Sequence, residues 1–162
     1  MRKLLSNSLV AVAGVVSLPI ASTQADSTKP AAEHRKHNDS RLASLRAFFS
    51  KSHSPALSLS PAFLEAADNY GLDWRLLPSI SFVESTGGKS AKNNNLFGWD
   101  SGRAAFTSGL ACIRSVAFSL ANSKLYRHKN VDGILKTYNA NADYAGRVKT
   151  VMRTIAENQQ MD

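Results

Sequence analysis

Apolar residues return every three or four positions through most of the chain beyond residue 41, and this spacing limits what the chain can fold into. It places apolar side chains on one face of an α-helix, whereas a half-buried strand would need strict alternation. Ser, Asp, Pro and Gly separate successive stripes, where they can begin or end helices. The pattern predicts one mainly α domain over 41–158, with about six helices and at most a short β-hairpin. The clearest stripes are Leu42, Leu45, Phe48 and Phe49; Phe63, Leu64, Ala67 and Tyr70; Leu76, Leu77, Ile80 and Val83; and Tyr144, Val148, Val151 and Ile155.

The ends of these helices can be predicted from residues that cap helices. A short polar side chain before a stripe can accept a bond from the first backbone N–H groups, and Gly after a stripe can adopt a left-handed conformation. Gly71 is expected to end one helix, and residues 74–86 to form the next, with Pro78 near its first turn. Residues 96–106 can form the hairpin, with residues 100–102 (DSG) as its turn. The predicted N-caps are Asp39-Ser40, Ser60, Asp73, Thr107 or Ser108, Asp132 and Asp143.

Residues 1–40 are expected to lie outside this domain. Arg2 and Lys3 precede the apolar run LVAVAGVVSLPIA (9–21), and small residues follow it, so residues 1–25 are predicted to be a secretory signal peptide. The run is shorter than the roughly 20 residues that span a membrane. We therefore expect cleavage rather than a retained anchor, export to the periplasm or cell envelope, and no stable membrane insertion afterwards. Residues 26–40 contain no Val, Ile, Leu, Phe, Trp or Tyr and are predicted to be a flexible tail.

Charge and cysteine content narrow the function classes. The formal net charge of +8, or +6 without Arg2 and Lys3 of the predicted signal peptide, favours an anionic partner, which can be cell wall, a membrane surface or nucleic acid. Nucleic acid is disfavoured, because the basic residues are scattered and not interleaved with aromatic residues. Cys112, the only cysteine, has apolar neighbours and is predicted to be buried, not to act as a nucleophile. His34 and His37 lack a third ligand nearby, so we predict no metal site and no cofactor.

Glu84 stands where an ordinary surface glutamate would not be expected. It follows Ile80 by four positions and Leu77 by seven, so it lies over the apolar stripe of the helix 74–86. It is also in the last turn, where the helix dipole disfavours a negative charge. We expect both effects to keep the carboxyl group protonated near neutral pH, as a general acid requires. The alternative is a boundary glutamate that pairs with a Lys or Arg.

The loop after Glu84 favours the catalytic interpretation. Two glycines (87–88) are expected to end the helix just past the carboxylate. Three asparagines (93–95) then offer amide donors and acceptors, and Phe97 and Trp99 offer apolar faces. Sugars present C–H faces to aromatic rings and hydroxyl groups to amides, so the loop fits a glycosidic substrate beside an acid.

Three blocks carry a resemblance to a known family. VESTGG (83–88) and NNLFGW (94–99) resemble the catalytic helix and loop of the endo-β-N-acetylglucosaminidase (glucosaminidase) domain family of bacterial peptidoglycan hydrolases. TYNANADYAGRVKTVM (137–152) resembles the closing motif of that family, a Tyr-Asn pair followed by a Tyr and a final helix. The likeness covers about residues 60–156. It implies a lysozyme-like fold and cleavage of β-1,4 glycosidic bonds at N-acetylglucosamine in peptidoglycan glycan strands.

The resemblance also implies roles by position. Glu84 matches the catalytic acid, and Tyr138 matches a catalytic tyrosine that faces it across the cleft. For Tyr138 and Tyr144 the alternative is core packing, because both lie on apolar stripes. The implied substrate-binding residues are Asn94, Asn95, Phe97, Gly98, Trp99, Asn139 and Tyr144.

Most glycosidases use two carboxylates, and Asp100 is the candidate for the second. An ordinary turn aspartate is the alternative for this residue. The family can instead use the N-acetyl group of the substrate, or its 6-hydroxyl, as internal nucleophile. The second route would make the protein a lytic transglycosylase that releases an anhydro-sugar. A non-catalytic module that binds cell-wall glycan is a third interpretation, and we expect a monomer in each case.

Overall fold

Short helices with clear end signals build the part of the chain that the computed structural model describes, residues 39–158. Within this range there are six α-helices, one 3-10 helix and no β-strand, which confirms the prediction of a mainly α domain. The signal peptide predicted at 1–25 and the tail predicted at 26–40 lie outside the described residues, except for Asp39 and Ser40 at the start of the first helix. The elements are α2 (Ser40–Lys51), η1 (Pro55–Leu59), α3 (Ser60–Tyr70), α4 (Leu76–Ser85), α5 (Gly109–Asn122), α6 (Val131–Tyr138) and α7 (Ala142–Glu157).

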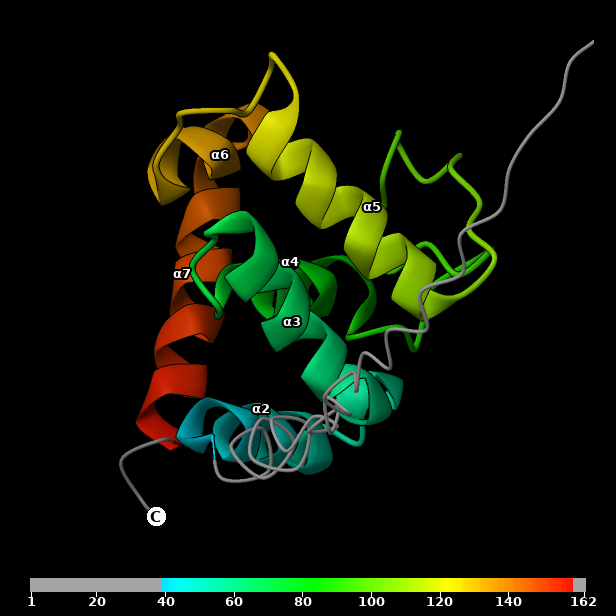
Figure 1. Cartoon of the computed structure of the whole chain (residues 1–162), viewed down its shortest axis with the longest axis vertical. Coiled ribbons are helices and arrows are strands. Elements are labelled where there is room, and N and C mark those ends of the chain that lie inside the picture. Colours follow the sequence, from blue (N-terminus) through cyan, green and yellow to red (C-terminus); the bar gives the residue numbers. More distant parts are fainter. Residues whose placement is uncertain (1–38, 159–162) are drawn as a thin grey trace, which may run out of the picture.

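The helices surround one apolar core. Figure 1 shows α7 along one side of the domain and α5 along the other, with α3 and α4 between them and α2 at one end. α4 packs mainly against α7, α3 against α5, and α2 against both α3 and α7. Phe49, Phe63 and Phe97 have no exposed surface and pack in series, with ring centroids 5.7 and 6.4 Å apart. Burial of each such side chain stabilises the fold by about 1.5–3 kcal/mol. None of the described helices is long and apolar enough to cross a membrane.

Several predicted helix ends are confirmed. The Asp39 side chain accepts a bond from the backbone N–H of Arg41 (2.9 Å) and caps α2. Gly71 ends α3 in the left-handed conformation, with φ 62°. Ser108 caps α5.

Cys112, within α5, is buried as predicted, and this burial raises the pKa of its thiol to about 11.

Asparagines, not the predicted aspartates, cap the last two helices. The side chain of Asn130 caps α6 and that of Asn141 caps α7, each by accepting a bond from a backbone N–H group. Asp132 and Asp143 lie in the first turns instead, where a negative charge interacts favourably with the helix dipole.

The first residues of α3 and α4 also differ from the prediction. Asp73 accepts a bond from the N–H of Arg75 (3.0 Å), but α4 begins only at Leu76, so the helix is shorter than the predicted 74–86. Ser60 does not cap α3, because its hydroxyl donates to the backbone oxygen of Leu57 (2.8 Å).

The hairpin predicted at 96–106 is wrong. The segment is a series of turns, and four of its residues have positive φ values between 53 and 81°. Residues in the left-handed region cannot extend into paired strands, because a strand needs φ near −120 to −140°. The predicted turn at 100–102 does form, since the N–H of Gly102 donates to the oxygens of Gly98 and Trp99. The residues with positive φ are Gly98, Asp100, Ser101 and Gly102.

Candidate active site

Glu84 is the second-last residue of α4, and the chain turns sharply just after it. Thr86 ends the helix in the left-handed conformation (φ 54°), one residue before the glycine at which the sequence predicts the end. Its N–H donates to the oxygen of Phe82 (2.8 Å). Gly87 follows with φ 63°, and a Cβ atom there would lie only 2.2 Å from the hydroxyl of Ser54. The start of η1 therefore packs directly on the end of the helix that carries Glu84.

The backbone of the following loop passes directly against the Glu84 carboxylate. Glu84 is half-buried, and a Cβ atom built on Gly98 would lie 2.8 Å from its Oε2 atom. Gly98 has φ 60°, a conformation that costs other L-residues about 1–2 kcal/mol. Glycine is therefore required here for two reasons, the backbone angle and the space that the carboxylate occupies.

Two tyrosines of the closing motif lie next to Glu84. Tyr144 is buried, and its hydroxyl lies beside the Glu84 carboxylate but forms no hydrogen bond with any described residue. Burial first, and then Glu84, raise the pKa of Tyr144. Tyr138 donates its hydroxyl to the backbone oxygen of Phe97, and burial, with smaller effects from Tyr144 and Glu84, raises its pKa. The Tyr138 hydroxyl is committed to the loop, whereas that of Tyr144 is available.

Four aromatic rings form a row that ends at this acid. Tyr144 and Tyr138 are stacked with an interplanar angle of 6° and centroids 5.9 Å apart. Trp99 lies 5.8 Å from Tyr138, and Tyr126 lies 6.0 Å from Trp99. Trp99 is half-exposed, so the row presents an aromatic face at the surface of the domain.

Two hollows meet at Gly98. The first, called here the acid hollow, has a volume of about 140 Å³, and Glu84 is the only acidic residue among those that line it. The second, called the aromatic hollow, has a volume of about 390 Å³. The acid hollow is lined by Glu84, Ser85, Ser90, Lys92, Asn95, Gly98 and Gly102. The aromatic hollow is lined by Gly98, Trp99, Asp100, Ser101, Leu125, Tyr126 and Tyr138.

Asn95 holds the loop in this position. Its buried side-chain amide donates to the oxygens of Trp99 (2.9 Å) and Ala104 (3.1 Å), and its oxygen accepts from the N–H of Trp99 (2.8 Å). The neighbouring Asn94 is exposed and donates to the oxygen of Phe106 (2.9 Å). Both amides thus serve the loop backbone, and only Asn95 also lines a hollow.

Three other predicted residues lie apart from the acid hollow. Phe97 is fully buried, so its ring cannot stack on a ligand, and it contributes a backbone oxygen to Tyr138 instead. Asp100 lines the aromatic hollow and forms an exposed ion pair with Arg103 (2.6 Å), which lowers the pKa of the carboxyl group. Asn139 is exposed, lines neither hollow, and accepts a bond from the backbone N–H of Asn141 (2.9 Å).

Sequence analysis missed Lys92 in the acid hollow and Tyr126 in the aromatic hollow. Tyr126 could have been found, because the pair of residues 125–126 is apolar within an otherwise polar connection between helices. Lys92 gives no such signal in a loop that is polar throughout. Among residues 39–158, no three His, Cys, Asp or Glu side chains are grouped as they would be to hold a metal ion.

The chain was compared with models of protein families, with curated proteins and with solved structures, and none of the three comparisons found a match.

Proposed function

We propose that the protein is an exported glycosidase that cleaves β-1,4 bonds next to N-acetylglucosamine in peptidoglycan, with Glu84 as general acid. The observation that carries the proposal is the position of the Glu84 carboxylate. It lies against Gly98, where the acid hollow and the aromatic hollow meet. A sugar ring stacked on the aromatic face would place a glycosidic oxygen within reach of this carboxyl group.

Glu84 suits the role of proton donor in this arrangement. Its half-buried side chain is adjacent to the available hydroxyl of Tyr144 and close to the ring of Tyr138. In the proposed reaction its carboxyl proton moves to the leaving oxygen as the bond to the anomeric carbon breaks. Tyr144 orients the carboxyl group, and Tyr138 fixes the loop that bears Gly98.

The lining of the acid hollow favours help from the substrate over a second protein carboxylate. Glu84 is the one acid there, and Asp100 is engaged with Arg103 on the aromatic hollow. The substrate can supply its own N-acetyl group, which leads to hydrolysis. Its 6-hydroxyl can act instead, which leads to an anhydro-sugar. This second outcome makes a lytic transglycosylase the second candidate function, on the same acid.

Two further features support the proposal. The blocks around Glu84, Gly98 and Tyr138 resemble those of the glucosaminidase domain family, and they come together in space at the acid. The formal net charge is +8 for the whole sequence and +6 without Arg2 and Lys3 of the predicted signal peptide, and this positive charge suits a polymer that carries peptide carboxylates.

The test is digestion of purified peptidoglycan by the wild-type chain and by Glu84→Gln, followed by analysis of the released muropeptides. We expect the variant to lose cleavage by roughly 10²–10⁴-fold. Glu65→Gln is the matched control, because Glu65 is a surface glutamate that pairs with Arg114. Reducing ends would identify a hydrolase, and anhydro ends a transglycosylase. Binding without cleavage by the wild type would replace both with a glycan-binding module.

A further inference from the structure

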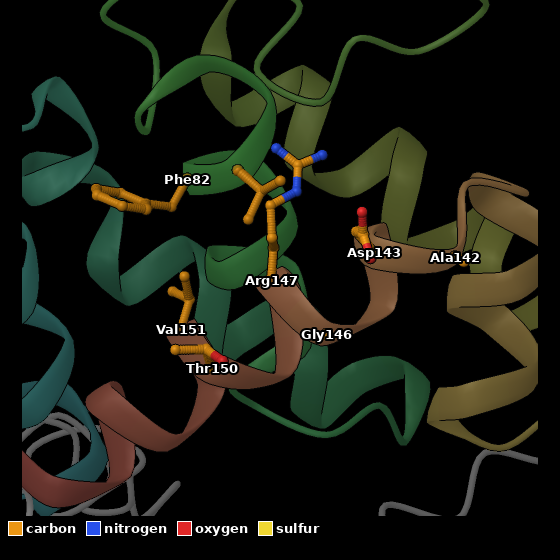
Figure 2. Close-up of a pocket in the computed structure, with 8 residues that line it drawn as sticks. Phe82, Ala142, Asp143, Gly146, Arg147, Thr150 and Val151 are labelled. Carbon is orange, nitrogen blue, oxygen red and sulfur yellow. The ribbon is translucent and has the colours of Figure 1, made fainter.

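A third depression lies between α4 and α7. This α4–α7 groove has a volume of about 620 Å³. Figure 2 shows Asp143 and Arg147 rising from α7, while Phe82 reaches toward the groove from α4. One of its lining residues, Val83, directly precedes Glu84 on α4. Its lining residues are Phe82, Val83, Ala142, Asp143, Gly146, Arg147, Thr150 and Val151.

The groove carries two opposite charges that the rest of the described chain leaves unpaired. Asp143 and Arg147 are one helical turn apart on α7, both are exposed, and neither forms an ion pair within residues 39–158. By contrast, Lys149 on the same helix pairs with Asp132 (2.7 Å). Exposed Asp and Arg at such spacing often pair with each other. Here they stay apart and can each contact a ligand.

The guanidinium group also links the groove to the acid. Arg147 lies over the ring of Tyr144, with its Cζ atom 5.8 Å from the centroid. The hydroxyl of that same ring is beside the Glu84 carboxylate. The ring of Tyr144 therefore lies between a ligand held by Arg147 and the Glu84 carboxylate.

The groove differs chemically from the two hollows that fit sugar. Its floor is apolar, with Phe82, Val83 and Val151, and small residues at 142 and 146 keep it open. A neutral sugar chain would leave both charges unmatched. A ligand with methyl groups, a carboxylate and an ammonium group would match all three properties.

We infer that the α4–α7 groove binds the short peptide that branches from the glycan strand. This peptide carries carboxylates for Arg147, the free amine of its diamino acid for Asp143, and alanine methyl groups for the apolar floor. The inference rests on the proposed function, since it assigns the groove to the same substrate. The chain then recognises strands that still bear peptides in preference to strands from which an amidase has removed them.

The test compares cleavage of two matched substrates, glycan strands with their peptides and the same strands stripped by an amidase. The measured quantity is the ratio of kcat/KM for the two. We expect the wild-type chain to favour peptide-bearing strands by roughly tenfold, which is the scale of one charged hydrogen bond. Arg147→Gln and Asp143→Asn should each move this ratio toward one. Arg46→Gln is the matched control, an exposed arginine on α2 that belongs to no ion pair among the described residues and should keep the ratio.

A second pair of variants fills the groove without changing its charge. A Cβ atom on Gly146 would meet nothing within 4 Å, and Gly146 lies inside a helix, so larger residues are accommodated and favour the helix. Gly146→Leu should occupy the groove and lower the ratio, whereas Gly146→Ala adds one methyl group and should keep it. A ratio that is unchanged in Gly146→Leu and Arg147→Gln would overturn the inference.

The outcomes separate the inference from the proposed function. Equal cleavage of both substrates by the wild-type chain would overturn the inference and leave the glycosidase intact. If the wild-type chain cleaved neither substrate, the proposed glycosidase activity would be overturned. Peptide binding to the groove would then be the remaining test of the inference. For that purpose the synthetic tripeptide L-Ala-γ-D-Glu-meso-diaminopimelate is titrated into labelled protein and followed by NMR. Shifts at residues of the α4–α7 groove that disappear in Arg147→Gln support the inference, and their absence overturns it.

Discussion

Residues 86–108 and the helices packed beneath them differ in what holds them in place. The helices α2, α3 and α5 bury a continuous set of apolar side chains, including Phe49 and Phe63 without exposed surface. The segment 86–108 has neither helix nor strand, and nine of its residues have positive φ. Its order depends on side-chain amides and hydroxyls that bond to backbone groups, above all Asn95 and Ser85. The residues with positive φ are Thr86, Gly87, Gly88, Asn93, Asn94, Gly98, Asp100, Ser101 and Gly102.

This difference determines how substitutions act. Apolar packing spreads its stabilisation over many partners, so a core substitution lowers the stability of the whole domain. A loop held by a few polar contacts can change its shape while the core remains folded. Stability and activity should therefore respond separately in the two regions. The four predictions below run from the largest to the smallest expected change in the free energy of unfolding.

Phe63→Ala should have the largest effect. Phe63 is fully buried between Phe49 and Phe97, so its loss leaves a cavity and should lower the free energy of unfolding by about 3–5 kcal/mol. Chemical denaturation followed by circular dichroism measures this loss. Phe118→Ala is the control, because Phe118 is 56% exposed and should cost far less. Similar losses in both variants would contradict the packing assigned to the core.

Asn95→Ala should lower the free energy of unfolding by an intermediate amount. It removes three hydrogen bonds and leaves the N–H of Trp99 without its partner, at a cost of about 1–3 kcal/mol. We expect glycan cleavage to fall much further than this loss of stability alone would cause, because the loop then no longer holds Gly98 at Glu84. Asn94→Ala, which removes a single exposed bond, serves as the comparison. If both variants retained full cleavage, the role of Asn95 in the site would be disproved.

Gly98→Ala should cost about 1–2 kcal/mol, since alanine is strained at φ 60°. Gly102→Ala introduces similar strain at φ 81°, but a Cβ atom there would contact nothing within 4 Å. Both variants should therefore lose similar stability in a thermal melt. Only Gly98→Ala should displace the Glu84 carboxylate and lose cleavage. Equal cleavage rates for the two would show that the contact between Gly98 and Glu84 does not matter for the reaction.

Tyr144→Phe should change stability least. The hydroxyl has no hydrogen-bond partner among the described residues, so its removal leaves no described group unpaired, and we expect a change below about 0.5 kcal/mol. Cleavage should nevertheless fall by roughly tenfold, about 1.4 kcal/mol, because the hydroxyl lies beside the Glu84 carboxylate and is proposed to orient it during the reaction. A loss of stability that matched the loss of activity would assign Tyr144 to the core alone.

The contrast between the helices and the segment 86–108 also explains what the sequence could predict. Asp39, Gly71 and Ser108 mark helix ends through contacts with residues only a few positions away, so their roles can be read locally. Asn130 and Asn141 cap helices in the same local way, but each precedes an aspartate that competes for the role in a sequence pattern. The six helices followed from the apolar spacing because each stripe is buried against its neighbours.

The loop could be predicted only in part. The DSG turn at 100–102 indicated a reversal of the chain, but Asn95 binds the backbone of Trp99 and Ala104 and replaces the ladder that a hairpin would need. Phe97 looked like a stacking surface because it stands only two positions before Trp99, and nothing in the sequence indicates that the Phe97 ring is buried in the core while Trp99 lines a hollow. Whether a loop ring faces the core or a hollow depends on contacts distant in sequence. Such contacts leave no periodic signal.

The row of rings beside Glu84 also provides a built-in optical probe. The chain has two tryptophans, and Trp99 stands between Tyr126 and Tyr138 in the aromatic hollow, whereas Trp74 lies just before α4 and lines neither hollow. A sugar that covered Trp99 would displace water from its indole and alter its emission. In a Trp74→Phe background, fluorescence would then report occupancy of the hollow from a single residue. Affinity for glycan fragments could be followed by titration without any attached label, including in variants that no longer cut.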